Sequence, residues 1–253
     1  FFRTVTTDAY QGPNLANYFA DTLKVQKVIV LDDSGAYGVG MADAFAAQAA
    51  KKGMTVAIRD RLDPLNADYT AILTRAKSLG VQGLYYGGDP LAGAKVVKQS
   101  YDILPDIPKG GGDGVHTPDM LTGGGMPAIQ GWYATSAAAH VLDDPSVRPW
   151  VERFVAKTGK QPADYSITYY DATQVILDAI ARVTQSGKPM NRANVRDAIA
   201  ATNLKTLQGD ISFDANGDTN SKVVSIFQVQ FDTSHPIGDV VHQFKYVGVA
   251  PEA

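Results

Sequence analysis

Unbroken apolar runs alternate in the first half of the chain with segments whose apolar residues recur at helical spacing. The runs include 28–31 and 83–86, and such runs are typical of strands that helices cover on both faces. Between them, apolar residues recur about once per helical turn, as at Leu15, Phe19 and Leu23, which predicts amphipathic helices. The order β-α-β-α-β-α-β predicts a doubly wound parallel sheet, an α/β fold.

Polar side chains follow three of these predicted strands, just beyond the point where each strand ends. Tyr37 follows the first of the three, Asp89 the second, and Asp113 and His116 the third, each after a turn that contains glycine. In open parallel α/β sheets, ligands bind beyond the carboxyl ends of the strands. These four residues are therefore expected to converge on one cleft.

The second half of the chain is expected to be mainly helical before it returns to strands. The predicted elements are one strand, three helices and two final strands, at 132–139, 145–157, 167–183, 195–201, 227–231 and 240–247. Three successive helices without strands of their own need a sheet from elsewhere.

Composition narrows the class of protein without naming its function. The chain has 253 residues, a hydrophobic content of 45% and a formal net charge of -3, which indicates a soluble globular protein. Because there is no run of Lys or Arg, a nucleic-acid partner is not expected. No apolar stretch approaches the roughly 20 residues that a membrane-spanning helix needs. The absence of cysteine excludes thiolate metal sites, disulfides and cysteine nucleophiles.

Several segments resemble motifs for a specific ligand or reaction, but their residue spacing does not match those motifs. The glycines of Gly38-Val39-Gly40 lack the third glycine of a dinucleotide loop. The segment 214–218 lacks the glycine and glutamate positions of a calcium loop, so a β-turn is predicted there. None of the four histidines stands in metal-ligand spacing, and no serine lies in a nucleophile elbow. The sequence therefore predicts no catalytic residue, no cofactor and no metal.

Six short motifs in a fixed order do point to a family. They are Arg3-Thr4 with Asp8 to Pro13, Val28 to Gly40, Leu84 to Gly88, Gly112 to Val115, Tyr169 to Ala172, and Phe213 to Asp218. Together they resemble the leucine/isoleucine/valine-binding type of periplasmic substrate-binding protein. The resemblance implies two α/β lobes of the periplasmic binding protein-like I fold, joined by three crossover strands. Such a protein closes its inter-lobe cleft over a small amino acid or analogue and delivers it, in the periplasm, to the membrane subunits of an ABC transporter.

The resemblance also implies which parts of the two lobes are present. By that alignment, residues 8–133 and 227–253 form a complete second lobe, and 134–224 form the helical remainder of the first lobe. The N-terminal segment of the first lobe, and the signal peptide of a periplasmic protein, are expected to precede this chain. The apolar helix faces within 134–224 would then lack their sheet, so self-association or mobility of this part is expected.

Four residues take individual roles from the resemblance. Tyr37 matches a tyrosine that contacts the ligand, Asp113 an acidic residue that binds the α-ammonium group, and Tyr165 an aromatic residue that closes over the ligand side chain. Asp89 stands where leucine-binding members have an aromatic residue. Because a carboxylate against an aliphatic side chain would be desolvated without a partner, Asp89 favours a polar or cationic ligand, or one held through water.

Structural interpretations of the same residues remain open. In these interpretations, Asp113 is only a turn residue in a glycine-rich loop, the typical place for an aspartate. Tyr37 would then be a loop aromatic that packs on its own helix, and His116 a histidine of a surface loop. Two other functions also remain open. One is an α/β enzyme that uses Asp89 and Asp113 as an acid-base pair, and the other is a ligand-sensing domain of the same fold.

Overall fold

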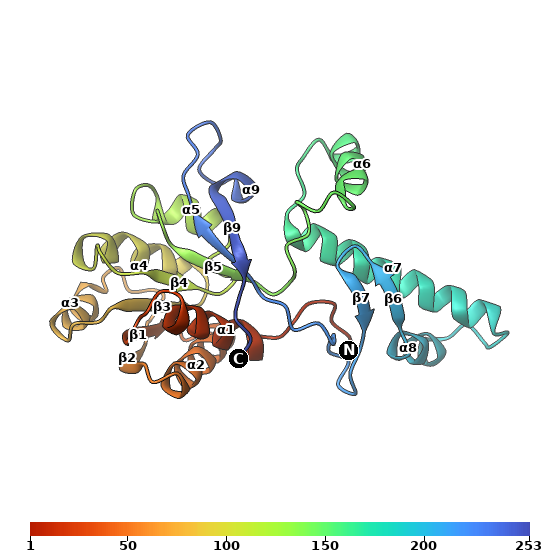
Figure 1. The fold of residues 1–253 in the computed structure, drawn as a ribbon, viewed down its shortest axis with the longest axis horizontal. Helices are drawn as coiled ribbons and strands as arrows, with labels where there is room; N and C mark the ends of the chain where they lie inside the picture. Colours follow the sequence, from red (N-terminus) through yellow and green to blue (C-terminus); the bar gives the residue numbers. More distant parts are fainter. The chain divides into compact units, whose positions relative to one another are not determined.

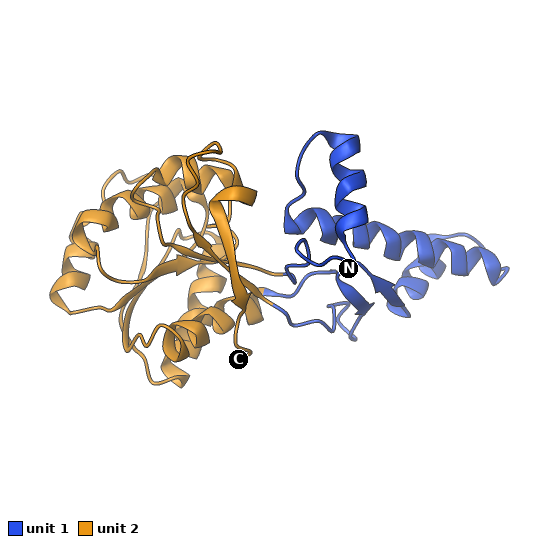
Figure 2. Ribbon diagram, turned by 45° about the horizontal axis from the view of Figure 1, so that its top comes forward, with its two compact units in different colours: residues 1–7, 138–223 blue, residues 8–137, 224–253 orange.

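The computed structural model describes residues 1–253, which divide into two compact units. Unit 1 consists of Phe1–Thr7 and Ala138–Val223, and unit 2 consists of Asp8–Ala137 and Val224–Ala253 (Figure 2). The backbone therefore passes from one unit to the other at three places along the sequence, after Thr7, Ala137 and Val223.

Unit 2 is built on a seven-stranded sheet with the order β2-β1-β3-β4-β5-β8-β9. The strands are β1 (Lys27–Asp32), β2 (Thr55–Arg61), β3 (Gly83–Gly87), β4 (Lys109–Gly111), β5 (Tyr133–Ser136), β8 (Ser225–Val229) and β9 (Phe244–Val249). The first five strands in that order are parallel, whereas β8 runs antiparallel to both of its neighbours. The predicted doubly wound α/β fold is confirmed, with two antiparallel pairings at one edge.

Helices cover both faces of this sheet (Figure 1). They are α1 (Asp8–Asp21), α2 (Ala36–Lys51), α3 (Thr70–Ser78), α4 (Pro90–Ile103), α5 (Pro118–Gly124) and the short α9 (Val240–Gln243). Alternate residues of β1 enter different cores: Ile29 packs with residues of α3 and α4, whereas Val28 packs with residues of α1 and α2. Both side chains are fully buried, and each contributes about 1.5–3 kcal/mol relative to exposure. Burial on both faces is why the strand is apolar at every position.

Unit 1 contains the three predicted helices and a β-hairpin. Its elements are α6 (Arg148–Thr158), α7 (Asp164–Gln185), α8 (Arg192–Ala200), β6 (Asn203–Thr206) and β7 (Gly209–Ser212). A small buried cluster forms around Trp150 and Ile167. The buried carboxylate of Asp171 in α7 accepts hydrogen bonds from the backbone N–H groups of Leu207 (3.2 Å) and Gln208 (3.0 Å), which fixes the hairpin turn to the helix.

Two segments differ from the sequence predictions. Residues 240–243 form a helical turn and not the start of the last strand, because the Asp239 side chain accepts a hydrogen bond from the N–H of His242 and caps that turn. The β6-β7 hairpin was not predicted, since its strands are only four residues long and Ile211 is the one buried residue in them. The predicted turn at 214–218 is present, with the N–H of Gly217 bonded to the carbonyl of Asp214 at 3.0 Å.

None of the helices combines the length and the apolar character that crossing a membrane requires.

Candidate functional site

The loops that follow β1, β3 and β4 meet at one edge of the sheet of unit 2. The three strands are parallel neighbours, so their carboxyl ends lie side by side. The backbones of these segments touch there. A Cβ added to Gly38, in the first turn of α2, would lie 2.7 Å from the carbonyl oxygen of Gly87 at the end of β3, and a Cβ added to Gly114 would collide with the carbonyl oxygen of Gly88. Glycine is needed at these positions because any larger residue would force the loops apart.

Tyr37 and Asp113 form the centre of this convergence. The hydroxyl of Tyr37 donates a hydrogen bond to Oδ1 of Asp113 at 2.6 Å, and it accepts one from the backbone N–H of Gly114 at 3.1 Å. Nε2 of Gln11 donates to the same carboxylate oxygen at 3.0 Å. The Asp113 carboxylate is thus held from two sides, by side chains of α2 and α1.

The electrostatics of the pair fix which partner donates. Burial raises the pKa of the Tyr37 phenol far above its usual value, and the negative charge of Asp113 raises it further. Tyr37 therefore keeps its proton at neutral pH and acts as the donor, while the carboxylate accepts. The pair presents a positioned anionic group at the end of β4.

Asp89 adds a second carboxylate to the same edge. Its backbone N–H donates to Oδ2 of Asp33 at 2.8 Å, while Oδ1 of Asp33 accepts from the N–H of Gly35 at 3.0 Å. The Asp89 side chain is exposed, yet its pKa is raised by partial burial and then by the charges of Asp33 and Asp113. Three acidic side chains therefore crowd one edge, an environment that favours a cation such as an ammonium group.

The structure separates the roles of the two adjacent aspartates after β1. Asp32 is fully buried, pairs with Nη1 of Arg59 at 2.5 Å, and accepts from the N–H of Ser34 at 2.7 Å. Asp33 instead connects its own loop to that of Asp89. Neither residue caps α2, whose N-cap is Gly35.

His116 lies against the antiparallel strands at the far edge of the sheet. Its ring stacks on Phe227 of β8, with centroids 4.5 Å apart, and meets Phe244 of β9 edge-on at 4.4 Å. Its backbone N–H donates to the carbonyl of Asp113 at 2.9 Å and closes the turn that carries that carboxylate. The imidazole is half-buried in an aromatic contact, so the structure gives it a packing role.

Tyr165 belongs to unit 1, where it is the second residue of α7 and is half-buried. The preceding residue, Asp164, is buried and accepts from Nδ1 of His140 at 2.8 Å, and Nε2 of His140 lies 3.2 Å from Asp143. Burial lowers the pKa of His140, but the hydrogen bonds and charges of these two aspartates outweigh it and raise the pKa overall. This ion pair fixes the start of the helix that carries Tyr165.

Gln11 is the functional candidate that sequence reasoning did not single out. It is fully buried in α1. A fully buried amide needs hydrogen-bond partners, and one of them is Asp113. In the sequence Gln11 appears only as one residue of the motif from Asp8 to Pro13, and that motif does not show which of its side chains reaches the site.

Comparison with known proteins gives a family match. Residues 1–234 match the model of a family described as periplasmic binding protein. The chain is 31% identical over 228 residues to Leu/Ile/Val-binding protein homolog 3 of Brucella melitensis, covering 90% of this chain and 60% of that relative. It is 26% identical over 233 residues to the leucine-, isoleucine-, valine-, threonine- and alanine-binding protein of Pseudomonas aeruginosa, covering 92% of this chain and 61% of that one.

Solved structures agree with these sequence matches. The structure of a leucine binding protein from Thermotoga maritima superposes with a TM-score of 0.82 at 26% identity, covering 98% of this chain and 67% of that protein. The chain spans about 60% of the length of the curated relatives.

Proposed function

The chain belongs to the periplasmic binding protein family, as its six ordered motifs indicated, and on that premise we propose that it is the solute-binding part of an ABC transporter for amino acids. Its ligand is an amino acid or a close analogue. Membership of a family of binding proteins favours binding over the alternative in which Asp89 and Asp113 act as an acid-base pair. The ligand-sensing alternative has the same fold, so the fold by itself does not distinguish it from a transport protein.

This proposal rests on the fixed position of the Asp113 carboxylate. Tyr37 and Gln11 both donate to its Oδ1 and hold it at the convergence of three strand ends. An ammonium group binds such a fixed carboxylate by a charge-assisted hydrogen bond, which is stronger than a neutral one. Because the carboxylate is already positioned, little side-chain entropy is lost on binding. We assign it the α-ammonium group of the ligand.

The other candidate residues take secondary roles in this proposal. Tyr37 contributes its ring to the ligand contact, and Tyr165 contributes an aromatic surface from unit 1. His116 supports the site through its backbone N–H, which closes the turn that carries Asp113. The exposed carboxylate of Asp89 favours a ligand whose side chain is polar or cationic, or is held through water. An aliphatic amino acid is then a weaker ligand than one with a hydrogen-bond donor in its side chain.

The proposed setting of this activity follows from the family. The binding protein acts in the periplasm and delivers its ligand to the membrane subunits of the transporter. No basic cluster in the sequence suggests a nucleic-acid partner.

Titration followed by NMR tests the proposal even if affinity is low. The backbone amides of Gly112 and Gly114 flank Asp113, so their signals should shift when L-leucine or L-threonine is added. Threonine should bind more tightly than leucine if Asp89 selects a polar side chain. As the matched ligand control, 4-methylpentanoate keeps the leucine side chain and carboxylate but lacks the ammonium group, and it should shift these signals far less. Equal shifts with both compounds would contradict the assignment to Asp113.

Asp113→Asn removes the charge while keeping an oxygen that Tyr37 and Gln11 can bond. It should weaken amino-acid binding by about 10-fold or more, the scale of a lost charged hydrogen bond. Asp119→Asn is the control, because Asp119 is an exposed residue at the start of α5. This variant should bind the amino acid with unchanged affinity. Unchanged affinity in Asp113→Asn would remove this residue from the site.

A further inference from the structure

The connection between β8 and β9 forms a second polar site, apart from the edge that carries Asp113. Because β8 runs antiparallel to β5, with Gln228 paired to Tyr133, its carboxyl end lies beside the amino end of β5. The connection therefore lies at the end of the sheet opposite the carboxyl ends of β1, β3 and β4. None of the polar residues of this connection belongs to the proposed amino-acid site.

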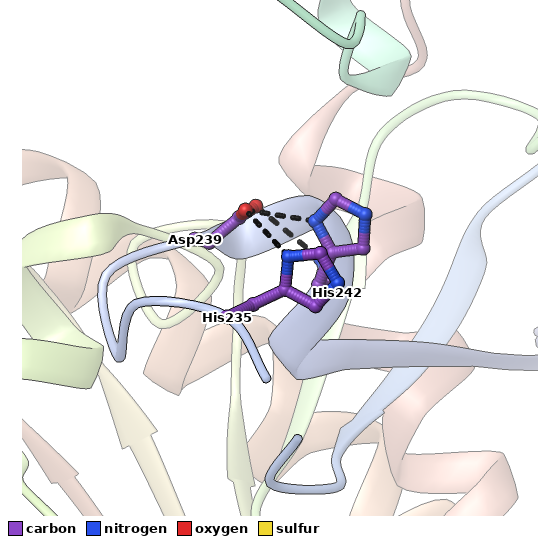
Figure 3. A group of neighbouring side chains, drawn as sticks. All are labelled: His235, Asp239 and His242. Atoms are coloured by element: carbon purple, nitrogen blue, oxygen red, sulfur yellow. Dashed lines mark hydrogen bonds and ion pairs between the residues drawn. The ribbon is translucent and has the colours of Figure 1, made fainter. Parts of the chain in front are cut away.

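Two histidines and an aspartate meet in this connection (Figure 3). Nδ1 of His242 lies 2.7 Å from Oδ2 of Asp239, and Nδ1 of His235 lies 3.8 Å from the same oxygen. The imidazole rings of His235 and His242 stack nearly parallel, with centroids 3.5 Å apart. Both rings therefore turn the same nitrogen toward one carboxylate oxygen.

The shape of the connection is fixed by a buried glutamine. The side chain of Gln243 has no exposed surface, and its Oε1 accepts from the N–H of Asp232 at 2.9 Å. Its Nε2 lies within hydrogen-bond distance of three carbonyl oxygens, those of Asp232 (2.9 Å), His235 (3.3 Å) and Pro236 (3.2 Å). These hydrogen bonds hold the backbone of His235 in place over His242, and none of them involves an imidazole ring.

We propose that His235, Asp239 and His242 bind one divalent transition-metal ion of the Zn²⁺ class. Zinc takes imidazole nitrogen at about 2.0–2.1 Å and carboxylate oxygen at about 2.0–2.2 Å. Ligand atoms of a tetrahedral site with such bonds lie about 3.3 Å apart. The observed separations of 2.7 and 3.8 Å fall on either side of that value. Because the two rings are stacked nearly parallel, one ring must also rotate about its Cβ–Cγ bond before both nitrogen lone pairs point at the same ion.

The ligand chemistry selects the class of metal. Two imidazoles and one carboxylate suit Zn²⁺, Cu²⁺ or Ni²⁺, whereas Ca²⁺ and Mg²⁺ prefer a shell made of oxygen atoms. Oδ2 of Asp232 lies 4.0 Å from Nε2 of His235, on the side of the ring away from Asp239. At this distance the carboxylate makes no hydrogen bond to the ring, and it would orient a metal-binding imidazole through its second nitrogen only after approaching by about 1 Å. Three protein ligands leave a fourth position for water.

The metal would cross-link the connection between the last two strands of unit 2. His235 lies in the loop, Asp239 is the N-cap residue of α9, and His242 lies within α9, which leads directly into β9. A bound ion joins these two segments and stabilises the folded state, since the histidines are not brought together in the unfolded chain.

Titration of the full, untagged chain with Zn²⁺ alone tests the proposal, using calorimetry and competition with a chromophoric chelator. One equivalent of Zn²⁺ should bind and raise the thermal midpoint, whereas Mg²⁺ at the same concentration should not. His242→Gln and His235→Gln should each weaken Zn²⁺ binding by at least about 10-fold. Asp239→Asn, which keeps an oxygen to cap α9, should weaken it with the helix intact.

His140→Gln is the matched control, because it removes a histidine from unit 1 and leaves the cluster untouched. Its stoichiometry and affinity for Zn²⁺ should equal those of the unmodified chain. The proposal is overturned if the chain binds no stoichiometric Zn²⁺. It is also overturned if folded His235→Gln and His242→Gln variants, checked by circular dichroism, bind Zn²⁺ as well as the unmodified chain.

Discussion

The hydroxyl of Tyr37 lies 2.6 Å from Oδ1 of Asp113, although 76 positions separate the two residues in the sequence. The contact joins the first turn of α2, which follows β1, to the loop after β4, across the intervening strand β3. The same hydroxyl oxygen accepts from the N–H of Gly114. One phenol therefore ties together the polypeptide segments on which the proposed ligand site depends.

Removing only that hydroxyl tests its structural contribution. Tyr37→Phe keeps the ring but leaves the N–H of Gly114 and the Asp113 carboxylate without this partner. The free energy of unfolding of unit 2 should fall by about 1–2 kcal/mol, measured by urea denaturation followed on unit 2 amide signals. Tyr101→Phe, at an exposed position of α4, should change stability by less than about 0.5 kcal/mol. Equal effects of the two variants would show that the Tyr37 hydroxyl adds nothing.

A pair of glycine substitutions tests how tightly the loops pack. A Cβ on Gly112 would lie 2.5 Å from the Tyr37 hydroxyl and 2.6 Å from Cε of Met41. Gly112→Ala should therefore destabilise unit 2 by about 1–3 kcal/mol, the usual cost of overpacking, and should weaken amino-acid binding. Gly40→Ala should instead stabilise by up to about 1 kcal/mol, since Gly40 lies in α2 with open space around it. The opposite sign at either position would contradict this account of the packing.

The stability of unit 1 should depend on pH through His140. Its pKa is raised in the folded protein by Asp164 and Asp143, so the folded state binds the proton more tightly than the unfolded state. The resulting stabilisation is complete below the unfolded pKa of about 6.5 and is lost as pH rises through the higher folded pKa. Urea unfolding followed on the amide signals of α7 should accordingly give a higher midpoint at pH 6 than at pH 8.

His140→Gln supplies the control for that pH dependence. Without a titrating ring beside Asp164, the difference between the two midpoints should shrink markedly. If the variant keeps the full difference, another group is responsible for the pH dependence of unit 1.

The exposed apolar face of α7 should cause the chain to self-associate. Ile176, Leu177 and Ile180 are 47%, 53% and 37% exposed, and contiguous apolar surface of this kind marks a contact surface. Light scattering should show a mass that rises with concentration, and Leu177→Lys should return it to that of the monomer. Leu65→Lys is the control, since Leu65 is 82% exposed in unit 2, and it should leave the association unchanged. A monomer at all concentrations would contradict the prediction.

The sequence by itself determined the parallel part of the sheet and the end of that sheet at which the proposed site lies. Unbroken apolar runs mark strands buried on both faces, and right-handed crossovers place the carboxyl ends of neighbouring parallel strands at one edge. Tyr37, Asp89 and Asp113 could therefore be assigned to a common edge before any coordinates were known. The ordered motifs likewise indicated the family, because order and spacing are properties of the chain alone.

Only the tertiary structure decided which side chains act together at that edge and elsewhere. Gln11 reaches Asp113 from a helix 102 positions away, and His235 meets His242 because a buried glutamine folds their loop. Hydrophobic periodicity reports which face of an element is buried, which is a local property. Hydrogen-bond partners depend on how loops approach one another after the core has packed, and no local pattern encodes that approach.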